Sequence, residues 1–209
     1  MEKKFLSRRN FLQNTAITAG ITAIAPTAIA SDLSLAKKNK SRSSHEVWFA
    51  GISLMGLRAE THEIMVEKIK GILSKALIYK PDFVCLPETF PFEYNQKKLS
   101  LAEMVEASKN VLEQFAEFSK HNSCYTVCPV YTSSEGRIYN SAVVFDRTGK
   151  RIGQYDKIHE TVGQVEKGVA CGALFQPVIQ TEFGPIGIQI CYDINFEDGW
   201  KMLRDQEAK

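Results

Sequence analysis

The sequence offers little to a metal ion. Its four histidines are scattered, and none of its five cysteines forms the closely spaced pairs that bind structural zinc. Cys124 and Cys128 fall four positions apart on one predicted strand, which places them roughly 13 Å apart. A disulfide needs about 4.4–6.8 Å between Cα atoms, so this pair cannot form one. We therefore expect no structural metal.

The sequence also lacks a long, strongly apolar run. The most apolar stretch, residues 15–30, is rich in alanine and threonine and is too short and polar for a confident membrane span. It follows Ser7-Arg8-Arg9-Asn10-Phe11-Leu12, which resembles a twin-arginine export signal, and it ends in Ala28-Ile29-Ala30, an A-x-A-like cleavage site. We expect residues 1–30 to be a signal peptide, with a periplasmic or extracellular product that keeps no stable membrane span. A poorly hydrophobic N-terminal helix is the alternative.

Strong net charge is missing as well. The formal charge is +2, but residues 1–30 and residues 31–43 each hold four basic groups and one acid, so about −4 remains on the rest. Residues 31–44 read as a flexible basic linker, and residues 45–209 as the folded domain. Nothing in this pattern indicates a nucleic-acid partner.

Within the folded part, two amphipathic helices alternate with short apolar runs. Helical spacing covers residues 60–79 and 101–121. Strands are predicted over residues 47–54, 83–86, 125–131, 141–146, 151–157, 178–181 and 186–191, with turns at Glu135-Gly136 and Thr148-Gly149. This mixture indicates a layered α/β or α+β domain.

The most informative stretch ends on Cys191. Ile186, Ile188 and Ile190 alternate on one face of a predicted strand, which leaves Gly187 on the face of the sulfur, with open space before it. A helix is expected to start after Cys191, with Asn195 as its N-cap. A thiol at a strand exit suits a nucleophile, although a free cysteine is more often a small buried hydrophobe.

Two further polar residues close apolar strands. Glu88 ends the run from Val84 through Leu86, where burial is expected to raise its pKa and make it a better base. Lys157 is the last residue of the strand predicted over residues 151–157. Taken singly, Glu88 can be an exposed loop residue and Lys157 a solvated one, and the adjacent His159 reads as a packing or hydrogen-bonding neighbour.

Three segments together resemble the nitrilase, or carbon–nitrogen hydrolase, superfamily. They are Leu86-Pro87-Glu88-Thr89, Tyr155-Asp156-Lys157-Ile158-His159 and Ile190-Cys191-Tyr192-Asp193. Lys157 lies 69 positions after Glu88, and Cys191 lies 34 positions after Lys157. The resemblance implies a nitrilase-like α-β-β-α sandwich carrying a Glu88–Lys157–Cys191 triad. It also implies a second pocket glutamate after the lysine, for which Glu166 is the candidate.

The implied chemistry is hydrolysis of a non-peptide carbon–nitrogen bond in a small amide-type or N-carbamoyl substrate. A cysteine beside an ammonium is expected to have a lowered pKa and to form a thioester, with the Tyr192 N–H and Lys157 stabilising the developing negative charge. Glu88 moves the protons. Neither a metal nor an organic cofactor is needed.

Members of the superfamily continue past the segment that ends at Arg204, so the fold is expected to be incomplete at its C-terminus and the full-length protein to be a homo-oligomer. Two alternatives follow. One is a catalytically inactive remnant or binding module of the same fold. The other is an exported thiol or redox protein that uses Cys124 and Cys128.

Overall fold

A computed structural model describes residues 46–209. The expected signal peptide (1–30) and linker (31–44) lie outside the described residues. The framework is a five-stranded mixed sheet in which the strands lie side by side in chain order. Its members are β1 (Phe49–Gly51), β2 (Phe83–Cys85), β3 (Tyr125–Ser134), β4 (Arg137–Phe145) and β5 (Arg151–Asp156).

Strand direction decides which residues meet. β1, β2 and β3 are parallel, whereas β4 is antiparallel to both β3 and β5. β5 therefore runs in the same direction as β2, and the two strands end at the same edge of the sheet. Glu88 follows β2 and Lys157 follows β5, so the topology brings both to that edge. The predicted turn between β3 and β4 is confirmed at Glu135-Gly136, where both residues have positive φ.

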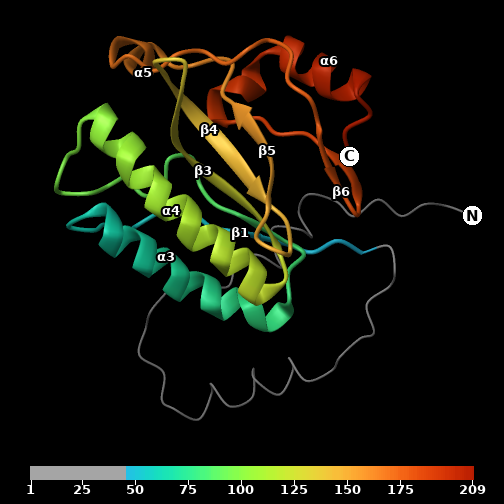
Figure 1. Ribbon diagram of the computed structural model, residues 1–209, viewed down its shortest axis with the longest axis horizontal. Helices are drawn as coiled ribbons and strands as arrows, with labels where there is room; N and C mark the ends of the chain where they lie inside the picture. Colours follow the sequence, from blue (N-terminus) through green and yellow to red (C-terminus); the bar gives the residue numbers. More distant parts are fainter. Residues whose placement is uncertain (1–45) are drawn as a thin grey trace, which may run out of the picture. The chain divides into compact units, whose positions relative to one another are not determined.

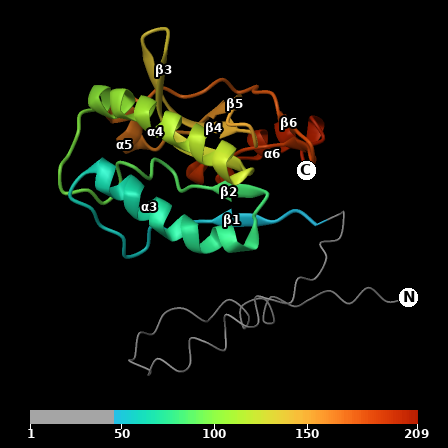
Figure 2. The same ribbon diagram turned by 60° about the horizontal axis from the view of Figure 1, so that its bottom comes forward.

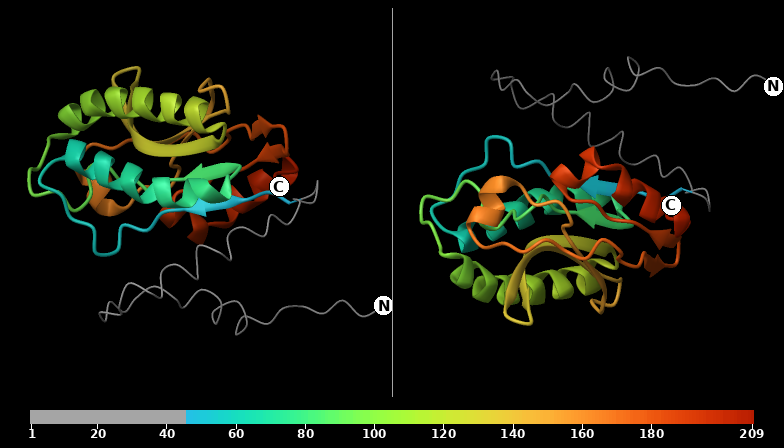
Figure 3. Two further views of the ribbon diagram at one scale, coloured as in Figure 1. Left: turned by 90° about the horizontal axis from the view of Figure 1, so that it is seen from below. Right: turned by 90° about the horizontal axis from the view of Figure 1, so that it is seen from above.

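Two helices cover one face of the sheet. α3 (His62–Ala76) continues into the 3₁₀ turn η1 (Leu77–Tyr79), and α4 (Leu101–Asn122) starts with a capping box in which Ser100 and Glu103 satisfy each other's backbone N–H groups. Figure 2 shows α3 next to β1 and β2, and α4 next to β3 and β4. Figure 3 shows the two helices side by side.

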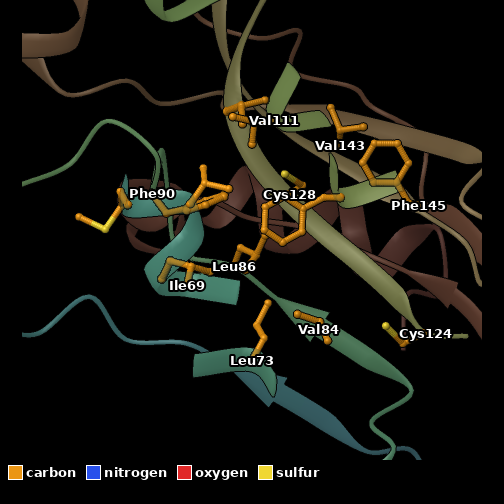
Figure 4. Close-up of a cluster of buried hydrophobic side chains, with 14 of the residues drawn as sticks. Ile69, Leu73, Val84, Leu86, Phe90, Val111, Cys124, Cys128, Val143 and Phe145 are labelled. Carbon is orange, nitrogen blue, oxygen red and sulfur yellow. The ribbon is translucent and has the colours of Figure 1, made fainter. Parts of the chain in front are cut away.

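The main hydrophobic core lies between these helices and the sheet. Ile69 and Leu73 of α3 and Phe115 of α4 are fully buried there against Val84 and Val143 of the strands. Figure 4 shows these layers meeting, with Cys124 and Cys128 among the apolar side chains. The two amphipathic helices predicted from the sequence are thus confirmed, and their apolar stripes form this core.

The opposite face of the sheet carries the C-terminal elements. These are α5 (Val162–Glu166), the hairpin β6 (Ile179–Thr181) and β7 (Gly184–Ile186), the 3₁₀ helix η2 (Cys191–Asn195) and α6 (Glu197–Asp205). In Figure 1, β4 and β5 lie between α4 on one side and α6 on the other. A second, smaller cluster fills this layer and joins Ala142 and Tyr155 of the sheet to Ile190 and Met202.

The strand predicted over residues 186–191 is only partly present. β7 ends at Ile186, and residues 187–190 pair with no strand among residues 46–209, although Ile190 keeps an extended backbone. Gly187 does not leave open space before the sulfur: a Cβ there would lie 2.4 Å from Leu203 Cδ2, so the glycine permits close approach of α6. The N-cap of α6 is Phe196 rather than Asn195.

The mixed α/β class expected from the sequence is confirmed. Among residues 46–209, no helix has both the length and the apolar character needed to cross a bilayer.

Replacing Phe115 with alanine is expected to lower the free energy of unfolding by about 3–5 kcal/mol, because the ring is completely buried and contacts Phe90 edge to face. Urea unfolding followed by circular dichroism measures this change. Phe175, which is 71% exposed, is the matched control. Its alanine variant should change the free energy of unfolding by no more than about 0.5 kcal/mol. Equal losses in the two variants would contradict the described core.

Candidate active site

Glu88 and Lys157 form an ion pair at the sheet edge. Lys157 is 1% exposed, and its Nζ lies 2.6 Å from Glu88 Oε1. The same oxygen accepts a hydrogen bond from Asn140 Nδ2 of β4 at 2.7 Å. Asn140 also fixes the lysine, since its carbonyl oxygen accepts from the Lys157 backbone N–H at 2.9 Å. One β4 residue thus aligns both members of the pair.

Cys191 reaches this pair from a third segment. It is the first residue of η2, and it lines the same cavity as Glu88 and Lys157, both of which act on the pKa of its thiol. Its backbone has φ 47°, and Thr89, the residue after Glu88, has φ 43°. Left-handed backbone at a non-glycine residue costs on the order of 1–3 kcal/mol, so the surrounding contacts must hold both positions in place.

The pKa directions overturn two sequence-based expectations. Burial alone would raise the pKa of the Glu88 carboxyl, but the hydrogen bond and charge of Lys157, helped by Asn140 and Cys191, lower it overall. The pKa of the Cys191 thiol is raised, by burial and by the Glu88 carboxylate, which together outweigh Lys157. Near neutral pH, Cys191 is therefore a protonated thiol and Glu88 an ionised carboxylate.

Gln164 occupies the place that the sequence analysis gave to Glu166. Its Oε1 lies 3.0 Å from Lys157 Nζ, and its Nε2 lies 3.4 Å from Glu88 Oε1. Glu166 is exposed at the end of α5 and does not border the cavity beside the triad. The reason is where α5 begins. Its N-cap is Thr161, so Gln164 is the third residue of the helix, and its side chain accepts a hydrogen bond from the Thr161 N–H and faces the lysine. Residues 165 and 166 are exposed.

Asp193 is a buried anchor that the sequence analysis passed over. Its carboxylate accepts hydrogen bonds from the Tyr155 hydroxyl, the His159 backbone N–H and the Ile190 backbone N–H at 2.8, 2.7 and 3.1 Å. It thereby joins the end of β5 to the turn that carries Cys191. The presence of an acid two residues after the cysteine, in the last of the three motifs, was the available signal.

His159 is a structural neighbour, as expected. Its Nδ1 and Nε2 each lie 3.1 Å from a carboxylate oxygen, of Asp193 and Asp198 respectively, and its ring stacks on Phe196 with 3.8 Å between centroids. Both ring nitrogens of His159 therefore face carboxylate oxygens.

Glu88, Lys157 and Cys191 all line a cavity of about 700 Å³. Polar and apolar side chains complete its lining, among them Gln164, Tyr94 and Met55. A second, more apolar cavity of about 340 Å³ reaches Glu88 and Cys191 from the other side, between β2–β4 and residues 186–191. Of these two cavities, Lys157 borders only the first.

Cys124, Cys128 and Cys171 lie in the core or outside both cavities beside the triad. Cys124 and Cys128 are buried at 0% exposure, burial raises the pKa of both thiols, and both are free. The thiol or redox alternative therefore lacks an accessible thiol at either position. Cys171 is exposed but borders neither cavity beside the triad. Residues 46–209 contain no cluster of three potential metal ligands.

The sequence profile of the carbon-nitrogen hydrolase family matches residues 50–209. The chain belongs to this family. A curated relative, deaminated glutathione amidase of Dictyostelium discoideum, is 24% identical over 159 residues, which are 68% of this chain and 55% of the relative. A probable hydrolase of Bacillus subtilis is 30% identical over 138 residues, which are 62% of this chain and 26% of the relative. The chain thus spans about half, or less, of the length of these relatives.

Solved structures of family members share the fold. A carbon-nitrogen hydrolase from Helicobacter pylori matches with a TM-score of 0.70 at 20% identity, over 78% of this chain and 57% of that chain. An amidase from Nesterenkonia, described as carrying the acetamide moiety of fluoroacetamide covalently at its active site cysteine, matches with a TM-score of 0.69 at 15% identity, over 80% of this chain and 64% of that chain. These matches confirm the expected nitrilase-like fold.

Replacing Asp193 with asparagine is expected to lower the free energy of unfolding by about 2–4 kcal/mol, because an NH₂ group would face buried donors. Urea unfolding measures the loss. Asp198 contacts the same histidine but its side chain is 51% exposed, so its asparagine variant should lose less than about 1 kcal/mol. A smaller loss for the Asp193 variant than for the Asp198 variant would refute the anchoring role.

Proposed function

We propose that this domain hydrolyses a non-peptide carbon–nitrogen bond, of an amide or N-carbamoyl compound, through a thioester on Cys191. The observation that carries the proposal is that Glu88 Oε1 lies 2.6 Å from Lys157 Nζ and that Cys191 lines the same cavity as this pair, where the Glu88 carboxylate acts on the pKa of its thiol. A carboxylate, an ammonium and a thiol from three distant segments then share one cavity.

The first half of the reaction forms the thioester. Glu88 takes the thiol proton as Cys191 Sγ attacks the substrate carbonyl carbon. The resulting oxyanion lies between the Lys157 ammonium and the Tyr192 N–H, the two donors beside the sulfur. Collapse of this intermediate breaks the carbon–nitrogen bond, and Glu88 returns its proton to the departing nitrogen, which leaves as ammonia or an amine.

The second half regenerates the thiol. Glu88, again a carboxylate, removes a proton from a water molecule that attacks the thioester carbon, and the same two donors stabilise the second oxyanion. The carbon–sulfur bond breaks, the proton held by Glu88 passes to the sulfur, and the acid product leaves. Every proton transfer uses the one carboxyl group that reaches both the sulfur and the cavity.

The names of relatives support the substrate class. Deaminated glutathione amidase is an amidase by name, and a beta-ureidopropionase of Arabidopsis thaliana is 27% identical over 143 residues. We extend both substrate types, amide and ureido, to this chain as a proposal. From the sequence we further propose export through the residue 1–30 signal and assembly of the full-length protein into a homo-oligomer.

Ammonia release from a panel of simple amides and N-carbamoyl compounds tests the proposal. The wild-type chain is expected to release ammonia from at least one compound, and Cys191→Ala to lower that rate by more than about 1,000-fold, because the nucleophile is lost. Cys171→Ala is the matched control, since Cys171 is exposed outside the site, and it should keep the wild-type rate.

A folded wild-type chain that releases ammonia from none of the panel would favour the inactive or binding-module alternative. A Cys191→Ala variant with full activity would refute the thioester.

A further inference from the structure

The 700 Å³ cavity beside the candidate triad is lined by one charged side chain that the proposed reaction does not use. This side chain is Glu93, which borders the cavity together with Glu88, Lys157 and Cys191. Its Oε1 accepts a hydrogen bond from the Thr89 hydroxyl at 3.1 Å, and it forms no ion pair with a residue in the range 46–209. A carboxylate in the wall of a cavity acts on any charged group that enters.

The backbone around Glu93 is anchored, although the Glu93 side chain is exposed. Phe90 and Phe92 are buried on one side of it. Asn95 is buried on the other side, and its Nδ2 donates to the Pro91 carbonyl oxygen at 2.7 Å. The loop therefore holds the carboxylate at the cavity before a ligand binds, which lowers the entropic cost of recognition.

The charges of the lining favour a cation over an anion. Among the described residues that border this cavity, Lys157 is the one basic side chain, and its ammonium is already paired with Glu88 at 2.6 Å. Glu93 therefore leaves the lining with a net negative charge. A substrate carboxylate would be repelled by this charge, whereas a substrate ammonium would pair with it.

Tyr94 adds a second feature that suits an organic cation. It follows Glu93 directly, borders the same cavity and is 53% exposed. The face of a tyrosine ring attracts ammonium and guanidinium groups. The volume of about 700 Å³ lies within the range of about 300–1,000 Å³ that is typical of ligand sites, so the cavity has room for a second functional group besides an amide.

We propose that Glu93 is a specificity-determining residue, which selects substrates that carry an organic cation, such as a primary ammonium, at the end remote from the amide or N-carbamoyl group. This inference rests on the proposed function, because it names the class of substrate for that reaction. The Glu93 carboxylate and the Tyr94 ring bind the cation, and this binding helps to hold the substrate carbonyl at Cys191.

Two methanethiosulfonate reagents of opposite charge test this preference without turnover. The 2-aminoethyl reagent is a cation and the 2-sulfonatoethyl reagent an anion, and each forms a mixed disulfide with a cysteine. The ratio of the cationic to the anionic rate at Cys191, mapped by mass spectrometry, is divided by the same ratio at Cys171, an exposed thiol outside the cavity. The normalised ratio is expected to exceed about 10 in the wild type and to fall at least about fivefold in Glu93→Gln.

Substrates of matched length give a second readout. The wild-type kcat/KM is expected to be higher for 4-aminobutanamide than for the neutral pentanamide, and lowest for the anionic succinamate. Glu93→Gln should lower the value for 4-aminobutanamide at least about fivefold and change that for pentanamide by less than about twofold. Glu166→Gln is the matched control, since it removes an exposed carboxylate that does not border the cavity, and it should keep both wild-type preferences.

A normalised wild-type ratio near one overturns the proposal whatever the variants do. A ratio that Glu93→Gln leaves unchanged, or that Glu166→Gln lowers equally, overturns it as well, and so does equal cleavage of 4-aminobutanamide and pentanamide. Because the thiol reagents need no turnover, a chain that releases ammonia from no test compound would refute the proposed function, and the reagent ratio would still decide whether Glu93 sets the charge preference of the cavity.

Discussion

A buried ammonium group needs an anion beside it, and in this domain that requirement falls on Lys157. Its side chain is almost fully enclosed, and Glu88 supplies the anion from the end of β2, with β3 and β4 lying between β2 and β5. The pair forms because β2 and β5 end at one edge: β3 is parallel to β2, and β4 is antiparallel to both β3 and β5, so β5 runs in the direction of β2. The sheet order and the candidate site therefore depend on the same contact.

The sulfur is placed by a different constraint. The turn that carries Cys191 has a left-handed residue at its start, and residues 187–190 lack strand partners among residues 46–209, so backbone pairing does not hold it. Asp193 does so instead, because its buried carboxylate binds the end of β5 and the Ile190 N–H together. The ion pair and this anchor both attach to β5, which is why three distant segments line one cavity.

The sequence predicted the features that depend on local pattern. The apolar stripes of α3 and α4 follow from 3.6-residue periodicity, and Glu88, Lys157 and Cys191 were found because each ends an apolar run. Features that depend on neighbours in space were missed. Glu166 was expected to line the pocket, but Gln164 faces Lys157 instead, because the side of α5 that faces the lysine depends on contacts made by its first turn and not on local pattern.

The pKa shifts of Glu88 and Cys191 also depend on neighbours in space that the sequence pattern does not reveal. The sequence predicted that burial would raise the pKa of Glu88, and Glu88 is indeed partly buried. The ammonium of Lys157, 2.6 Å away, nevertheless lowers that pKa overall. For Cys191, burial and the Glu88 carboxylate together outweigh the charge of Lys157, so the pKa of the thiol is raised. The resulting arrangement of a protonated thiol and an ionised base suits a nucleophile that is activated only when its proton is removed.

The coupling between Glu88 and Lys157 is the most direct test of this account. A double-mutant cycle of Glu88→Gln and Lys157→Met, followed by urea unfolding, measures it. Because each single change leaves one buried partner alone, the account predicts that each costs about 3–5 kcal/mol and that the double variant loses at least about 1 kcal/mol less than the sum. Losses that add to within about 0.5 kcal/mol would contradict it, since the two groups would then not be paired in the folded protein.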